Sequence, residues 1–193
     1  TAIRINPKFS EAYYNLGNVY KQLNQFDLAI QSYKNTIQTN PSFYQALNNL
    51  GVLYKDIGDF DSSVDYLKRA IKCKPDYIDA INNLGISLKL LDKKDEAVLN
   101  FNKVVKIDEK NKEALNNLAI IKYEKGEHEK AIDDFKKIIK IHPQYPEAYN
   151  NLGVTLKKVN KVDIAISYFQ KALDIKKNYA EAMYNLGNCY KLK

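Results

Sequence analysis

A short tract ending in Asn-Leu-Gly, or a close variant of it, recurs along this chain at one fixed spacing. The shared asparagine of the tract stands at Asn15, Asn49, Asn83, Asn117, Asn151 and Asn185. Subtracting Asn15 from Asn49 gives 34 residues, and every later interval is the same. A constant period of 20 to 50 residues is typical of stacked repeat proteins, in which each repeat contacts only its neighbours. We therefore do not expect the chain to close around a single globular core.

Each repeat is expected to form two amphipathic helices joined by a short polar turn. In the fifth repeat, the first helix is predicted over residues 147–158 and the second over residues 163–176. Apolar or small residues recur in both segments at the i, i+3, i+4, i+7 spacing of one helical face. An acidic residue opens each second helix, where it complements the helix dipole; these residues are Asp27, Asp61, Asp95, Glu129 and Asp163. Helix ends are marked by prolines at Pro7, Pro41, Pro75 and Pro143.

The same spacing divides the chain into one continuous array. Residues 1–9 are expected to be the end of a preceding repeat, and residues 180–193 the first helix of a sixth. The complete repeats between them are predicted at residues 10–43, 44–77, 78–111, 112–145 and 146–179. Because this pattern starts and stops inside a repeat, we expect a segment of a longer array.

Small residues recur where the two helices of a repeat are expected to approach closely. They stand at Gly17, Gly51, Gly85, Ala119, Gly153 and Gly187. The residues expected to face them are Ala29, Ser63, Ala97, Ala131 and Ala165. Glycine within a helix costs about 0.5 to 1 kcal/mol relative to alanine, so its recurrence implies a compensating contact.

This combination resembles the tetratricopeptide repeat (TPR) family, whose pattern runs bulky apolar, Leu-Gly, Tyr, then Ala, Phe and Ala, then Pro. The first repeat matches with Tyr13, Leu16, Gly17, Tyr20, Ala29, Tyr33 and Pro41. Local departures are Lys122, in the Tyr position of the fourth repeat, and Ser63, in place of Ala in the second. The resemblance implies an all-α fold, a right-handed α-solenoid superhelix of helix-turn-helix repeats whose first helices line the concave face.

The asparagines are the candidate binding residues. Asparagine within a helix costs up to about 0.7 kcal/mol relative to alanine, so a complete column of six needs a reason. A second column precedes four of them, at Asn48, Asn82, Asn116 and Asn150. A side-chain amide can pair with both the C=O and the N–H of a peptide unit. We therefore predict that both columns bind the backbone of an extended peptide in the concave groove. The alternative is that each amide bonds to a neighbouring helix or its backbone and only locks the repeat spacing.

Two rows of charges flank the asparagines on the same helices. Acids precede them at Glu11, Asp79, Glu113, Glu147 and Glu181, and lysines follow at Lys21, Lys55, Lys89, Lys157 and Lys191. The acids could select basic side chains of a client. The helix dipole also favours acids in the first turn and lysines in the last, and we prefer that interpretation.

Composition and motifs argue against several other classes of function. The net charge is +7, but the lysines are interspersed with acids on the second helices and form no stripe with stacking aromatics, which argues against nucleic-acid binding. His128 and His142 have no partners at metal-ligand spacing, and no phosphate loop or nucleophile motif occurs. We expect no catalytic residue, metal or cofactor site in this segment, and we expect Cys73 to occupy a core position.

The sequence also carries expectations about location. No apolar run approaches the roughly 20 residues needed to cross a bilayer, so no membrane contact is expected. Cys73 and Cys189 lie more than three repeats apart, too far to pair. A reducing compartment, cytoplasmic or nucleocytoplasmic, is therefore expected.

The repeat style is similar to the TPR arrays of O-GlcNAc transferase and its relative SPINDLY, which present protein substrates to a separate glycosyltransferase domain. The resemblance implies client polypeptides as partners and catalytic residues outside this segment. A TPR scaffold in a multisubunit assembly is the alternative. A co-chaperone clamp is disfavoured, because it needs basic residues where this chain has acids and asparagine. The last helix, with Met183, Leu186 and Tyr190, is expected to expose apolar surface or to bury it against another molecule, as in a homo-oligomer formed through repeat ends.

Overall fold

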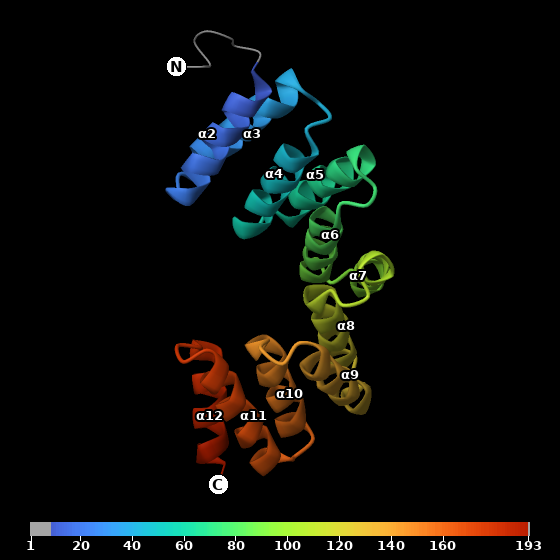
Figure 1. Cartoon of the computed structure of the whole chain (residues 1–193), viewed down its shortest axis with the longest axis vertical. Coiled ribbons are helices and arrows are strands. Elements are labelled where there is room, and N and C mark those ends of the chain that lie inside the picture. Colours follow the sequence, from blue (N-terminus) through green and yellow to red (C-terminus); the bar gives the residue numbers. More distant parts are fainter. Residues whose placement is uncertain (1–8, 193) are drawn as a thin grey trace. The chain divides into compact units, whose positions relative to one another are not determined.

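The computed structural model describes residues 9–192, and every regular element in this range is an α-helix (Figure 1). The first helices of the repeats are α2 (Ser10–Gln22), α4 (Tyr44–Asp56), α6 (Ile78–Leu90), α8 (Lys112–Glu124), α10 (Pro146–Lys158) and α12 (Ala180–Lys191). The second helices are α3 (Phe26–Thr39), α5 (Phe60–Cys73), α7 (Lys94–Ile107), α9 (His128–Ile141) and α11 (Val162–Ile175). The predicted all-α helical repeat array is confirmed. The repeat end predicted over residues 1–9 lies, apart from Phe9, outside the described residues.

The helices belong to two compact units, which we call unit 1 (up to Ile107) and unit 2 (from Asp108). Within each unit, the two helices of a repeat pack against each other, and each second helix also packs against the next first helix. First helices of consecutive repeats are in contact as well: α4 with α6 in unit 1, and α8 with α10 and α10 with α12 in unit 2. Each unit therefore presents a row of adjacent first helices. No helix within the described range is long and apolar enough to span a membrane.

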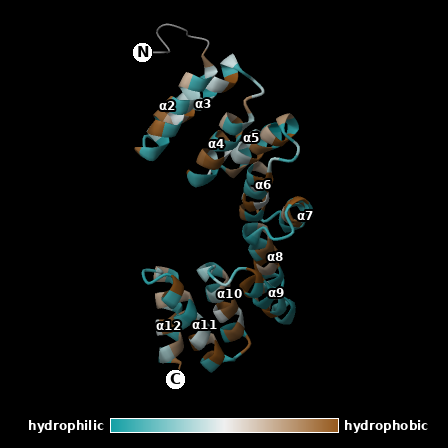
Figure 2. Cartoon of the chain, viewed as in Figure 1, coloured by the Kyte–Doolittle hydropathy of each residue, from teal (hydrophilic) through white to brown (hydrophobic). Residues whose placement is uncertain are grey.

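One large side chain per repeat fills the space between its two helices. These side chains, almost completely buried, are Tyr33, Leu67, Phe101, Phe135 and Phe169. They recur with the 34-residue period, since subtracting 33 from 67 gives 34. Figure 2 shows hydrophobic and hydrophilic residues alternating along most helices, as expected for helices that bury one face. The core is therefore repeated in small layers rather than gathered in one place.

The glycines allow these large side chains to lie against the first helix. A Cβ atom added to Gly153 would lie 2.6 Å from a ring carbon of Phe169, and one added to Gly17 would lie 2.6 Å from the Tyr33 ring. The predicted close approach is present, but the facing group is mainly this ring, one helical turn beyond the alanine that we expected. Gly187 differs, because no atom would lie within 4 Å of its added Cβ.

Gly153→Ala and Gly187→Ala form a matched pair that tests this packing. Gly153→Ala should lower the free energy of unfolding by about 1 to 3 kcal/mol, because the methyl group overlaps a buried ring. Gly187→Ala should raise it by up to about 1 kcal/mol, because only the helix propensity changes. Urea unfolding followed by far-UV circular dichroism measures both. Equal shifts of the same sign would refute the packing explanation.

The turn inside each repeat contains one residue with a left-handed backbone. The positive φ angles occur at Asn24, Gly58, Asp92, Gly126 and Asn160, again 34 residues apart. Glycine, asparagine and aspartate are the residues that adopt this conformation most readily. The backbone conformation of the turns therefore repeats with the same period as the buried side chains.

The charged rows lie at the helix ends, as the dipole interpretation requires. Glu11, Asp79, Glu113, Glu147 and Glu181 are in the first turns of their helices. Lys21, Lys55, Lys89, Lys157 and Lys191 are in the last turns. Acids near helix N-termini and lysines near C-termini each contribute about 0.3 to 1 kcal/mol at exposed sites.

The prediction that Cys73 is a core residue is wrong. Cys73 is exposed, and its counterparts Ile107 and Ile141 are 44% and 43% exposed. The position is the last residue of each second helix, and the chain turns away there towards the next repeat. Helical periodicity placed Cys73 on the apolar face but did not show that this last residue of the helix is left uncovered.

The two departures from the repeat pattern have partners of their own. Lys122 forms an ion pair with Asp134 of the facing helix α9. The Ser63 and Ser87 hydroxyl oxygens lie 2.8 Å apart, and both residues are fully buried. Each unusual polar side chain is thus paired with a second polar side chain. Burial requires this of the two serines, whereas Lys122 is only partly buried.

Candidate functional site

The two asparagine columns lie on the rows of first helices but differ in burial. We call Asn15 and its equivalents the first column, and Asn48 and its equivalents the second column. In the first column Asn15 is exposed, Asn49, Asn83, Asn117 and Asn151 are half-buried, and Asn185 is buried. In the second column Asn48, Asn116 and Asn150 are buried, and Asn82 is half-buried. The second column therefore lies deeper between the helices than the first.

Amides of the two columns bond to each other across neighbouring repeats. The Nδ2 of Asn83 donates to Oδ1 of Asn48 at 3.1 Å. Asn151 donates in the same way to Asn116 at 3.0 Å, and Asn185 to Asn150 at 3.1 Å. Each donor follows its acceptor by 35 residues, which is one repeat plus one position. Bonds of this kind are what the alternative role of the asparagines, a lock on the repeat spacing, requires.

In unit 1 these bonds continue into the first repeat. Asn48 donates to Oδ1 of Asn49 at 3.3 Å, and Asn49 donates to Oδ1 of Asn18 at 3.1 Å. Asn49 also lies 3.4 Å from the hydroxyl of Tyr14, which stands where other repeats have a second-column asparagine. The Tyr33 hydroxyl donates to Asn18 at 2.8 Å. Burial raises the pKa of Tyr33 to about 12, so this phenol keeps its proton near neutral pH.

In unit 2 a buried amide orients an acidic side chain. Asn150, whose exposed fraction is 0%, accepts from Asn185 and donates to Oε1 of Glu181 at 3.0 Å. The hydroxyl of Tyr179 donates to the other carboxylate oxygen of Glu181 at 3.4 Å. The exposed Glu181 carboxylate thus accepts one hydrogen bond from Asn150 and a longer one from Tyr179.

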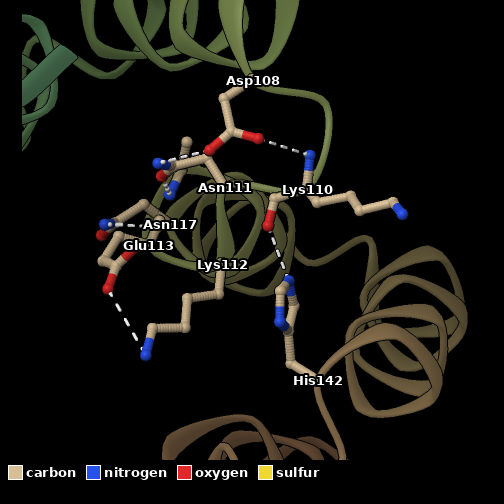
Figure 3. Close-up of polar contacts among 8 residues, drawn as sticks. Asp108, Lys110, Asn111, Lys112, Glu113, Asn117 and His142 are labelled. Atoms are coloured by element: carbon tan, nitrogen blue, oxygen red, sulfur yellow. Dashed lines mark hydrogen bonds and ion pairs between the residues drawn. The ribbon is translucent and has the colours of Figure 1, made fainter.

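Figure 3 shows the polar contacts at the start of unit 2. Asn117 donates to the backbone carbonyl of Glu113 in its own helix at 2.9 Å. The Asp108 carboxylate accepts from the backbone N–H of Lys110 at 3.1 Å. His142 donates through Nε2 to the carbonyl of Lys110 at 2.6 Å. His142 thus ties one repeat junction to the next, and the aspartate organises a turn that lacks the usual proline.

A hollow of about 260 Å³ lies beside Asn151 in unit 2. Its walls come from α8, α9, α10 and α12, and its lining residues are Ile120, Tyr123, Glu124, Phe135, Asn151, Val154, Thr155 and Glu181. This hollow was not predicted from the sequence. A signal was present, since Ile120 and Val154 each stand three residues after a first-column asparagine, on the same helical face.

The burial of the amides changes which asparagines can contact a client. Asn48 and Asn150 are buried and use both amide functions within the fold, so we correct the expectation that they contact a peptide. Asn49 is likewise committed through its nitrogen and its oxygen. Asn83 and Asn151 are half-buried and give only one amide N–H to the fold. The peptide-binding role of the asparagines remains a prediction, and these two are its best candidates.

Residues 9–192 contain no group of three or more His, Cys, Asp or Glu side chains placed to hold a metal ion. The described residues instead provide hydrogen-bonding side chains and a hollow with both polar and apolar walls.

The fold and the rows of first helices define an all-α repeat scaffold for binding other proteins. Models of the tetratricopeptide repeat match residues 10–43, 44–77 and 146–179, and another match covers residues 78–111. A TPR repeat model matches residues 120–160. The chain therefore belongs to the tetratricopeptide repeat family.

Solved structures of similar fold include several TPR proteins. MamA is 27% identical, with a TM-score of 0.72 over 89% of this chain and 94% of that one. YrrB, described as a TPR protein with an unusual peptide-binding site, is 22% identical, with a TM-score of 0.70 over 95% of this chain and 94% of that one. A thermophilic TPR protein of Thermus thermophilus is 16% identical, with a TM-score of 0.78 over 94% of this chain and 99% of that one. No curated protein sequence matches the chain.

Asn150→Ala and Asn15→Ala test the structural role of the columns. Asn150→Ala should lower the free energy of unfolding by about 1 to 3 kcal/mol, because it leaves Asn185 and Glu181 without their partner. Asn15→Ala should leave it unchanged or raise it by up to about 0.7 kcal/mol, because Asn15 is exposed and alanine is the better helix former. Urea unfolding measures both. A similar effect of the two substitutions would contradict the assigned roles.

Proposed function

We propose that this chain binds extended polypeptides along the row of first helices in each unit, with Asn83 and Asn151 holding the peptide backbone. The observation that carries the proposal is the state of these two amides. Each gives one N–H to the neighbouring repeat and keeps its Oδ1 and second N–H free of bonds to the described residues. Both side chains are half-buried, so solvent and a ligand can reach them.

The free donor and acceptor of such an amide suit a peptide unit. One side-chain amide can accept from a backbone N–H and donate to a backbone C=O of the same strand. The inter-repeat bond holds each amide in place beforehand, which lowers the entropy lost on binding. Each hydrogen bond contributes about 0.5 to 1.5 kcal/mol, so one amide gives weak binding and the neighbouring surface supplies the rest.

A scaffold role without a bound peptide is the second candidate. The observation that favours it is the amide pairing itself, because bonds between repeats stiffen an array whether or not a client is present. In that case the asparagines serve only the spacing, and the partners of this protein dock on other surfaces.

The glycosyltransferase context and the nucleocytoplasmic location remain predictions from the resemblance of the repeats to O-GlcNAc transferase and SPINDLY. The amide columns on the first helices support the comparison at the level of repeat style. Reading the rest of the gene that encodes this chain tests the prediction directly, because a glycosyltransferase domain is recognisable from its own sequence.

Peptide binding can be tested with a peptide selected from a random phage-displayed library on the immobilised protein. The selected peptide is labelled with fluorescein, and its affinity is measured by fluorescence polarisation. Asn83→Ala or Asn151→Ala, whichever lies in the unit that binds the peptide, should raise Kd by about 2- to 12-fold, the equivalent of one lost hydrogen bond.

The matched controls are Asn48→Ala and Asn116→Ala. These substitutions remove the buried acceptors of the same two inter-repeat bonds. The accessible donor amides of Asn83 and Asn151 stay in place. Their Kd values should rise less than those of the Asn83 and Asn151 variants, because the preorganising bond is lost but the accessible amide remains. If donor and acceptor variants lose affinity equally, the effect comes from the fold. If no peptide is selected, the scaffold role gains support.

A further inference from the structure

We propose that the hollow of unit 2 receives a lysine side chain of the bound polypeptide, with its ammonium group at Glu181. This inference rests on the proposed function, since it names the side chain that accompanies a backbone held at Asn151. The acidic side chain and the amide line the same hollow. Backbone contact and side-chain selection would therefore occur at adjacent points.

The size of the hollow suits one long side chain. Its volume is about 260 Å³, below the roughly 300 to 1,000 Å³ of sites for drug-sized molecules and cofactors. The apolar wall is formed by Ile120 and Val154, with the almost fully buried Phe135 beneath. An aliphatic stem can bury its methylene groups against such a wall while the charged end stays near solvent.

The charge at the hollow is negative. Glu181 and Glu124 both belong to its lining. No lysine or arginine nitrogen of the described residues lies within ion-pair distance of Glu181, whose oxygens are held by Asn150 and Tyr179. Both hydrogen-bond donors to this carboxylate are neutral, so the described residues provide it with no compensating cation.

Two tyrosines near the acidic row of unit 2 have a raised pKa. Burial raises the pKa of Tyr179, and Glu181 and Glu147 raise it further. Burial likewise raises the pKa of Tyr145, with a further contribution from Glu147 and Glu113. The acidic row of unit 2 therefore raises the pKa of both tyrosines, and Glu181 is the member of this row that lines the hollow.

The remaining wall adds a contact suited to a cation. Tyr123 contributes an aromatic ring to the lining, and an ammonium group near such a ring gains from cation–π attraction. The net charge of +7 opposes a basic ligand at long range. That opposition is screened beyond about 8 Å at physiological ionic strength, so the nearby Glu181 carboxylate has the larger effect on the ligand.

The first experiment compares three peptides that differ at one position. They are fluorescein-labelled versions of the peptide selected above, with lysine, norleucine or glutamate at the position that contacts unit 2, located by scanning each position in turn. The lysine peptide should bind about threefold to tenfold more tightly than the norleucine peptide, and the glutamate peptide most weakly. Equal binding of lysine and norleucine peptides at every position would overturn the inference and leave the proposed function intact.

Variants of the protein then locate the charge. Glu181→Gln keeps an oxygen for the Asn150 amide but removes the negative charge, so it should abolish the preference for lysine without weakening the norleucine peptide. Glu129→Gln makes the same charge change at an exposed position on α9, outside the hollow, and should preserve the preference. Equal effects of the two variants would show a general charge effect and would overturn the assignment.

A second experiment does not depend on peptide binding. Nα-acetyl-lysine methylamide and its norleucine counterpart are titrated into the protein, and amide chemical shifts are followed by NMR. Only the lysine compound should shift resonances around Tyr123, Val154 and Glu181, and Glu181→Gln should remove the shifts. If these shifts appear but no peptide binds, the proposed function fails and the hollow stands as a cation site. If they are absent, the inference is refuted.

Discussion

The rest of the structure depends on amides that are buried between repeats and must be paired. A buried side-chain amide without a partner costs about 1 to 3 kcal/mol. Asn48, Asn116 and Asn150 are buried and accept from Asn83, Asn151 and Asn185 of the following repeats. Apolar packing alone would tolerate a small slip of one repeat along the next. A slip that breaks these bonds leaves polar atoms unpaired, so the amides select one spacing.

The same constraint determines which groups remain for a partner. A side-chain amide has two donors and one acceptor oxygen, and the neighbouring repeat takes only part of this capacity at Asn83 and Asn151. At Asn49 and Asn150 the fold uses both the nitrogen and the oxygen. Asn150 also orients Glu181, so a residue that no ligand can reach still shapes the hollow in unit 2. Structural and binding roles are thus divided between residues of one repeated pattern.

The period predicted the helices, their charged ends and the close approach at the glycines, because these features follow from local spacing along one helix. It did not predict the pairing of Asn151 with Asn116, because an offset of one repeat plus one residue depends on how two helices are rotated against each other. The hollow was missed for a similar reason, since four helices meet there. The exposure of Cys73 was not predicted, because helical periodicity does not show which residues at a helix end are covered by a neighbouring helix.

A double-mutant cycle on Asn151 and Asn116 tests the central claim most directly. The free energy of unfolding is measured for the unmodified protein, Asn151→Ala, Asn116→Ala and the double variant. A structural bond between the two amides predicts a coupling energy of about 0.5 to 1.5 kcal/mol, so that the double variant loses less than the sum of the single variants. Strict additivity of the two losses would show that the amides do not lock the repeats together.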